Sequence, residues 1–124
     1  MLVVDDNDVN RLVATGLLAS MGYEAVEAND GIAAVEAVTA ATPGELAAVL
    51  MDVHMPRMDG FDATRALREL EADGGRPRMP ILALTATAAP SERAACLAAG
   101  MDDFLTKPLG REELRTALER WVRV

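Results

Sequence analysis

The segment from residue 47 to residue 60, AAVLMDVHMPRMDG, contains a short apolar run that ends at a carboxylate. The run Ala47–Met51 is aliphatic throughout and is followed directly by Asp52. An apolar run of this length, bounded by Asp, Pro and Gly, is typical of a strand that is buried on both faces. We therefore expect a buried strand that presents Asp52 at its carboxyl end.

Similar runs lie on both sides of this segment and alternate with helical patterns. The expected strands are Leu2–Val4, Tyr23–Glu27, Ala47–Met51, Ile81–Leu84 and Phe104–Thr106. The expected helices cover residues 8–21, 31–41, 61–71, 90–99 and 111–122. Their boundaries are predicted by a C-terminal Gly22, an N-terminal Asp30, a stop at Pro43–Gly44 and an N-terminal Pro90. Strands and helices that alternate in this way imply an α/β fold, with a parallel sheet covered by helices on both faces.

The first expected helix carries two apolar stripes. The wider stripe, expected to face the core, consists of Val13, Ala14, Leu17, Leu18 and Met21. The narrower stripe consists of Val9, Leu12 and Gly16. It has two interpretations, which are scattered surface apolarity or a contact for the helices of a partner.

Polar side chains follow four of the expected strands at the point where each strand ends. They are Asp5 and Asp6, Asp52, Thr85 and Lys107. The carboxyl ends of parallel strands share one edge of an open sheet, where ligands bind. Lys107 is the only lysine among 12 basic residues, which favours a site that needs a compact ammonium group.

Three crowded carboxylates repel one another, and a hard divalent cation removes the conflict. Mg²⁺ prefers oxygen ligands and binds to one or two carboxylates together with a phosphate. A remaining carboxylate can attack a phosphoryl group, while an ammonium and a hydroxyl stabilise its oxygens. Each residue alone has a simpler explanation, such as helix capping by Asp5 and Asp6 or a turn at Asp52. Their joint placement with the lone lysine favours a phosphoryl site.

The motifs at these positions resemble the receiver domain of two-component response regulators. They are VVDDN at 3–7, MDVHMPRMDG at 51–60, ALTA at 83–86 and KP at 107–108. The resemblance covers essentially the whole chain. The stretches at 6–11 and 96–105 are most similar to receivers of hybrid sensor histidine kinases. The resemblance to receiver domains implies a doubly wound, flavodoxin-like (βα)5 fold with strand order 2-1-3-4-5. It also implies that residues 1–124 form one domain, which stands alone or belongs to a larger hybrid kinase.

The resemblance also implies a role for each matching residue. Asp52 would be the phosphoacceptor, and Mg²⁺ would be bound by Asp5, Asp6, Asp52 and the backbone carbonyl of His54. Thr85 and Lys107 would be the catalytic contacts to the phosphoryl oxygens, and Lys107–Pro108 would be a cis peptide. Thr85 and Phe104 would form the switch. We expect the exposed imidazole of His54 to tune dephosphorylation rather than to bind metal.

The function implied is phosphorelay signalling. A histidine kinase or a histidine phosphotransfer domain would donate the phosphoryl group, with Val9 and Leu12 as candidate docking residues. A downstream partner would bind the face formed by the 90–99 helix, the last strand and the last helix. Such a domain assists its own phosphorylation and dephosphorylation and is not a conventional turnover enzyme.

The alternatives are an aspartyl-phosphate-forming phosphohydrolase, a nucleotide- or flavin-binding module, and a pseudo-receiver that works without phosphorylation. The haloacid dehalogenase family of phosphohydrolases would need Asp at position 54, and the nucleotide-binding module would need a glycine-rich loop after the first strand.

The composition narrows the other classes of function. The 12 basic and 20 acidic residues give a net charge of −8, which argues against direct binding of nucleic acid. A single cysteine, Cys96, forms no internal disulfide, and a single histidine excludes a zinc site with several histidines of one chain. Since no apolar run reaches the length of a membrane span, we expect no membrane contact and a cytoplasmic location.

Overall fold

The computed structural model of the protein describes residues 1–42, 45–55 and 57–122. Five parallel strands form one sheet in the order β2-β1-β3-β4-β5, which confirms the predicted fold class and strand order. The elements in chain order are β1 (Leu2–Val4), α1 (Asp8–Ser20), β2 (Val26–Ala28), α2 (Gly31–Ala40), β3 (Val49–Asp52), α3 (Gly60–Gly74), β4 (Ile81–Thr85), α4 (Pro90–Ala99), β5 (Asp103–Thr106) and α5 (Arg111–Trp121).

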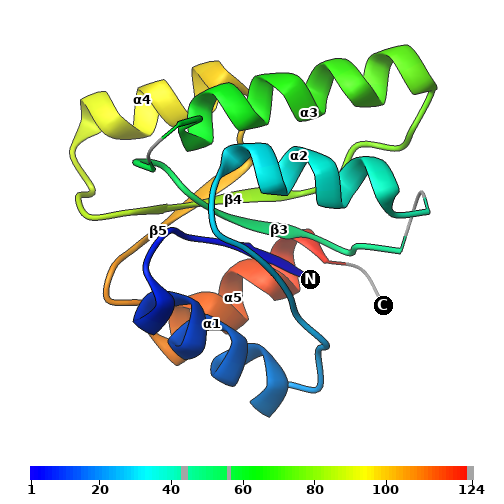
Figure 1. The fold of residues 1–124 in the computed structure, drawn as a ribbon. Helices are drawn as coiled ribbons and strands as arrows, with labels where there is room; N and C mark the ends of the chain where they lie inside the picture. The colour runs from blue at the N-terminus through cyan, green and yellow to red at the C-terminus, as the bar shows by residue number, and fades with distance from the viewer. Residues whose placement is uncertain (43–44, 56, 123–124) are drawn as a thin grey trace.

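The sheet lies between two layers of helices (Figure 1), with α2, α3 and α4 on one face and α1 and α5 on the other. Alternate residues of each strand point to opposite faces. Val49 and Met51 of β3 accordingly pack in the core below α2, α3 and α4, while Leu50 packs in the core beside α1 and α5. Because both faces are covered, the central strands β1, β3 and β4 are buried along their whole length.

Helix ends are set by local capping in most of the molecule. The side chains of Asn7, Asp30 and Asp59 each accept a backbone hydrogen bond in the first turn of α1, α2 and α3. Gly22 after α1 and Gly100 after α4 have φ of 88° and 106°, a conformation that glycine adopts without steric cost.

Several predicted boundaries were wrong. β2 begins at Val26 rather than Tyr23, because its partner β1 is only three residues long and the ladder runs from Leu2↔Val26 to Val4↔Ala28. α3 continues to Gly74, where Gly75 in the left-handed conformation ends it. The predicted stop at Pro43–Gly44 lies outside the described residues.

The structure also decides against the capping explanation for Asp5 and Asp6 and corrects one expectation for α1. Asn7, not Asp5 or Asp6, caps the helix, and the backbone N–H of Asn7 itself donates to Asp5 Oδ1 at 2.9 Å. Val13 was expected in the core, but 45% of its surface is exposed, while Ala14 and Leu18 are buried. Within the described residues, no helix combines the length and apolarity needed to cross a membrane.

Candidate functional site

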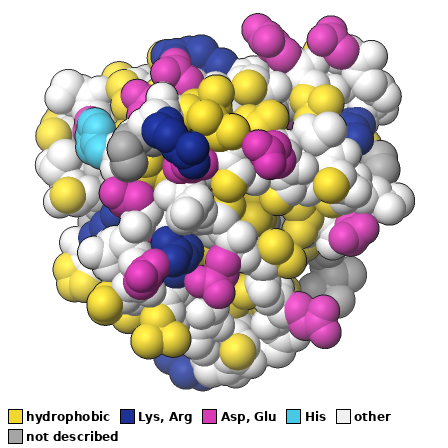
Figure 2. Space-filling model, viewed as in Figure 1, with side chains coloured by type: hydrophobic (Ala, Val, Ile, Leu, Met, Phe, Trp, Pro, Cys, Tyr) yellow, Lys and Arg dark blue, Asp and Glu magenta, His cyan; other side chains and the backbone are white. Residues whose placement is uncertain are grey.

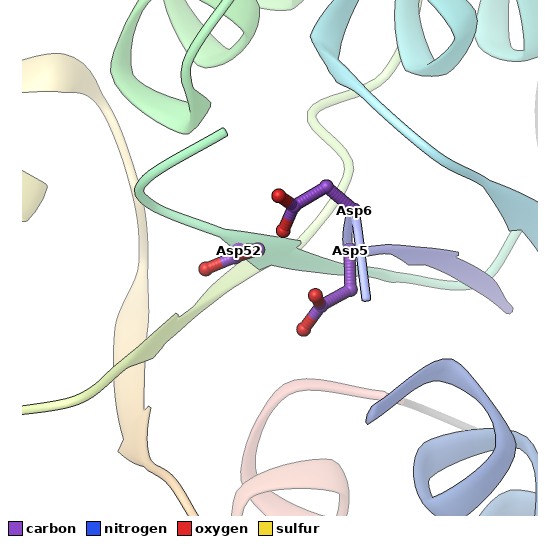
Figure 3. A group of neighbouring side chains, drawn as sticks. All are labelled: Asp5, Asp6 and Asp52. Carbon is purple, nitrogen blue, oxygen red and sulfur yellow. The ribbon is translucent and has the colours of Figure 1, made fainter. Parts of the chain in front are cut away.

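Three carboxylates meet at the carboxyl-terminal edge of the sheet (Figure 3). Asp5 and Asp6 follow β1, and Asp52 is the last residue of the neighbouring strand β3. Each contributes an oxygen, and these oxygens lie within 4.8 Å of one another. Asp5 and Asp52 are buried, whereas Asp6 is exposed. The parallel topology therefore brings together groups that lie more than forty positions apart in the sequence.

Lys107 comes from the loop after β5 and completes the cluster. Its Nζ donates to Asp52 Oδ1 at 2.9 Å and lies 3.1 Å from Asp5 Oδ2. Its backbone N–H donates to the carbonyl of Thr85 at 2.8 Å, which fixes the loop to the end of β4. The Lys107–Pro108 peptide bond is cis, as the resemblance implied.

The charges at this edge oppose one another. Burial raises the pKa of Asp52 to about 6, and the carboxylates of Asp5 and Asp6 add to the rise, while Lys107 partly offsets it. Burial lowers the pKa of Lys107, but its interactions with the carboxylates of Asp52 and Asp5 outweigh burial and leave that pKa raised. One ammonium therefore serves two buried carboxylates, and the cluster holds more negative than positive charge.

The donor set fits a hard divalent cation. Among the described residues, Asp5 Oδ2 is a buried oxygen without a hydrogen bond of acceptable geometry, although Lys107 lies near it. A buried carboxylate oxygen of this kind retains lone pairs for a ligand. Oxygen atoms from Asp5, Asp6 and Asp52 are the ligand type that Mg²⁺ prefers.

Thr85 is buried at the end of β4, but its hydroxyl contacts the start of α4. The Oγ1 atom lies 3.2 Å from the carbonyl oxygen of Thr87 and 3.3 Å from Oε1 of Glu92. The same Glu92 oxygen lies 3.1 Å from Nε2 of His54. Thr85 lies at the end of β4, and its hydroxyl bonds to Thr87 and Glu92 on the α4 side. Its contact with a phosphoryl group stays a prediction.

The chain matches the family model described as the response regulator receiver domain over residues 1–119. The protein belongs to this family. The chain is 45% identical to the sensor protein GacS of Pseudomonas syringae pv. syringae over 121 residues, which are 98% of this chain and 13% of that protein.

Two solved receiver-domain structures are similar to this fold. The receiver domain of the sensor histidine kinase PA1611 from Pseudomonas aeruginosa PAO1, solved with a magnesium ion coordinated in its active-site cleft, is 43% identical with a TM-score of 0.84, covering 97% of this chain and 93% of that one. A chain in the co-crystal structure of the Saccharomyces cerevisiae phosphotransfer protein Ypd1 and the Ssk1 receiver domain is 26% identical with a TM-score of 0.90, covering 98% and 86%. The predicted similarity to receivers of sensor histidine kinases is confirmed.

Phe104 of this receiver domain lies on β5 between α4 and the sheet core. Its ring is half-buried and packs against the core on the α2–α3–α4 face, and the guanidinium of Arg93 lies 5.3 Å from its centroid. The neighbouring Asp103 accepts a hydrogen bond from Trp121 of α5 at 2.9 Å. Phe104 thus contacts α4 through Arg93.

The candidate docking residues lie on the outer surface of α1. Val9 and Leu12 are 66% and 71% exposed, Gly16 is exposed, and Val13 adds to the same apolar surface. Figure 2 shows hydrophobic side chains at the lower left of the molecule, where Figure 1 places α1. Val13 also lines a small cavity together with Lys107 and Pro108, so this surface continues toward the carboxylate cluster.

Sequence reasoning missed Glu92. The residue lies in the first turn of α4 and is the shared partner of Thr85 and His54. Its sequence signal is weak, because an acidic residue at the start of a helix is common for reasons of helix stability alone.

Proposed function

We propose that this receiver domain accepts a phosphoryl group on Asp52. The observation that carries the proposal is the buried carboxylate at the end of β3, bonded to the only lysine of the chain and adjacent to two further carboxylates. A raised pKa near 6 still leaves Asp52 mostly ionised at neutral pH, so the carboxylate can act as a nucleophile.

The transfer balances as follows. An Asp52 oxygen forms a bond to phosphorus, and the bond between phosphorus and the imidazole nitrogen of a donor phosphohistidine breaks. That nitrogen retains the electron pair, and because the other ring nitrogen of the phosphohistidine carries a proton, the donor leaves as neutral imidazole. Lys107 neutralises negative charge on the phosphoryl oxygens, and Thr85 donates its hydroxyl to one of them. In dephosphorylation, water attacks the phosphorus of the aspartyl phosphate, inorganic phosphate leaves and the Asp52 carboxylate is restored.

The residues proposed to hold Mg²⁺ are Asp5, Asp6, Asp52 and the backbone carbonyl of His54. When bound, the ion neutralises charge on the phosphoryl oxygens. The magnesium in the cleft of the 43% identical PA1611 receiver supports this assignment. His54 is 71% exposed at its side chain, which supports the proposal that its imidazole tunes dephosphorylation rather than binds metal. An imidazole at this position replaces the carboxyl group that the phosphohydrolase alternative needs.

Asp52→Asn tests the acceptor. This variant should lose phosphorylation by a small-molecule phosphodonor in Mg²⁺, because an amide oxygen is a far weaker nucleophile than a carboxylate. Intact-protein mass spectrometry would follow the gain of one phosphoryl group. Asp59→Asn, which changes an acid that caps α3, is the matched control and should be phosphorylated like the wild type. Phosphorylation of Asp52→Asn at the wild-type rate would refute the assignment.

The donor is proposed to be a histidine kinase or a histidine phosphotransfer domain that docks on Val9 and Leu12. The Ypd1–Ssk1 co-crystal structure supports a partner of this class. Leu12→Glu should slow transfer from a protein donor about tenfold or more, because a charge in an apolar interface is poorly solvated. The rate with a small-molecule donor should not change. Equal effects on both donors would contradict docking at this surface.

The remaining parts of the proposal concern the whole protein. The chain spans 13% of the length of its GacS relative, so we propose that residues 1–124 are the receiver domain of a hybrid histidine kinase. Its location would be cytoplasmic. The output would be read on the face formed by α4, β5 and α5, through coupled movement of Thr85 and Phe104.

A further inference from the structure

Glu92 joins two segments of the site that are far apart in the sequence. Its Oε1 oxygen accepts from the Thr85 hydroxyl at 3.3 Å and lies 3.1 Å from Nε2 of His54, which is 38 positions away. The Glu92 side chain is 18% exposed, so the contacts are partly shielded from water. The start of α4 is therefore tied both to the switch hydroxyl and to the loop after the acceptor strand.

Within the described residues, α4 begins without a side-chain N-cap, and its glutamate in the first turn bonds outside the helix. α4 begins at Pro90, and its N-cap residue Ala89 provides no side-chain cap. α5 also lacks one, whereas α1, α2 and α3 are each capped by Asn or Asp. Glu92 occupies the third helical position, from which a glutamate commonly bonds back to the N-cap backbone. Here its carboxylate contacts Thr85 and His54 instead. The carboxylate thus links the helix to the site at a position where the helix dipole also favours it.

Resting on the function proposed above, we propose that Glu92 is a positioning residue, which holds the Thr85 hydroxyl toward α4 until a phosphoryl group on Asp52 competes for it. The hydroxyl carries one proton, and that proton is shared between the Thr87 carbonyl and Glu92. To donate to a phosphoryl oxygen, Thr85 must release both acceptors. Release of Glu92 also removes one of the two contacts of its carboxylate, so the first turn of α4 is then held to the site only through His54.

The energetic consequence is a population shift. If the arrangement with Thr85 turned toward Asp52 is a minor state, its population limits the apparent affinity for a phosphoryl mimic. Loss of the Glu92 acceptor should raise that population and tighten binding. The effect should be about fivefold, which corresponds to one net hydrogen bond.

The experiment is a titration of beryllofluoride, a phosphoryl mimic, at fixed saturating Mg²⁺, followed by ¹H–¹⁵N NMR. Glu92→Ala should bind the mimic about fivefold more tightly than the wild type. Glu92→Gln, which keeps an acceptor oxygen but loses the charge, should fall between the two. Glu69→Ala and Glu69→Gln make the same changes at an exposed position of α3 and control for net charge. Both should bind like the wild type.

A double-mutant cycle with Thr85→Val separates the tie from simple electrostatic repulsion. Without the hydroxyl there is nothing for Glu92 to hold, so Glu92→Ala should have no effect in that background. An effect that persists there, or that appears equally in the Glu69 variants, would overturn the proposal. Unchanged or weaker binding of beryllofluoride by Glu92→Ala would overturn the proposal as well. If the alanine variant does not fold, the comparison of Glu92→Gln with Glu69→Gln decides whether Glu92 holds Thr85. If the wild type itself fails to bind beryllofluoride, the acceptor assignment falls and this inference falls with it.

Discussion

Helices α4 and α5 flank the same edge strand, β5, but they are held by different forces. α5 buries Leu114, Ala117 and Leu118 almost completely. α4 buries only Cys96 and Ala99, while its one large aliphatic residue, Leu97, is 53% exposed. Since apolar burial contributes roughly 25 cal/mol per Å², far less hydrophobic free energy fixes α4 than α5.

The polar contacts of α4 and α5 also differ, because within the described residues only α4 bonds to a residue of the site. Trp121 and Arg120 of α5 both donate to the carboxylate of Asp103, which lies at the opposite end of β5 from Lys107. Glu92 of α4 bonds instead to Thr85, a residue of the site itself. A helix held by few apolar contacts and by a partner in the site can respond to chemistry there, whereas α5 serves as a fixed support.

Removing one large side chain from each helix tests whether α5 is packed more firmly than α4. Leu118→Ala should lower the free energy of unfolding by about 3 kcal/mol, because it leaves a cavity at a buried position. Leu97→Ala, the same change on α4, should alter it by less than about 0.5 kcal/mol. Urea denaturation followed by circular dichroism measures both. Equal losses would show that α4 is packed as firmly as α5.

A second prediction concerns the proposed acceptor Asp52 at the end of β3. The pKa of Asp52 is raised from 3.8 to about 6 in the folded state, so the folded protein binds more protons than the unfolded chain between these values. Stability therefore falls as pH rises through this window. One pKa unit is worth about 1.4 kcal/mol, and the hydrogen bond that Lys107 loses offsets part of the gain. Asp52→Asn should thus stabilise the protein by about 2 kcal/mol at pH 7.5 in EDTA.

Urea denaturation at several pH values checks this prediction. The gain from Asp52→Asn should shrink toward zero near pH 4, where the wild-type carboxyl is protonated in the folded state. Asp73→Asn, at an exposed position of α3, is the control and should show no such dependence. A gain that is independent of pH would mean that the strain at this edge does not arise from ionisation of Asp52.

The sequence predicts the fixed parts of the molecule better than the adjustable ones. Strands β3 and β4 were recognised because their aliphatic runs and flanking Asp, Pro and Gly are local signals. Asp5, Asp52 and Lys107 were brought together correctly because parallel strands share an edge. The strand order itself came from the family resemblance and was not deducible from periodicity.

What could not be predicted depends on distant partners. The start of β2 at Val26 follows from the length of β1, with which it pairs. The exposure of Val13 depends on where α1 crosses the sheet. Glu92 meets His54 and Thr85 only because the loops after β3 and β4 run side by side, and no local pattern encodes that approach.

The smallest expected effect is that of changing Asp103, whose carboxylate holds α5 through Trp121 and Arg120. The change tests whether these contacts serve stability alone. Asp103 Oδ1 accepts from the backbone N–H of Phe104, and Oδ2 accepts from Trp121 and Arg120. Asp103→Asn replaces one acceptor oxygen with a donor, so one of these partners loses its bond. We expect a loss of about 1 kcal/mol in the free energy of unfolding, with faster amide hydrogen exchange in the last turn of α5. Glu119→Gln, an exposed change on the same helix, should have neither effect.

The same variant sharpens the contrast between the helices when beryllofluoride binding is measured. If α5 is a support rather than part of the switch, Asp103→Asn should bind the mimic within about twofold of the wild type, although it is less stable. Glu92→Ala should do the reverse, with altered affinity and little change in stability, because it removes a partly shielded polar contact rather than an anchor of the core. An affinity change in Asp103→Asn as large as that in Glu92→Ala would place α5 in the switch, and β5 would then be flanked by two responsive helices instead of one.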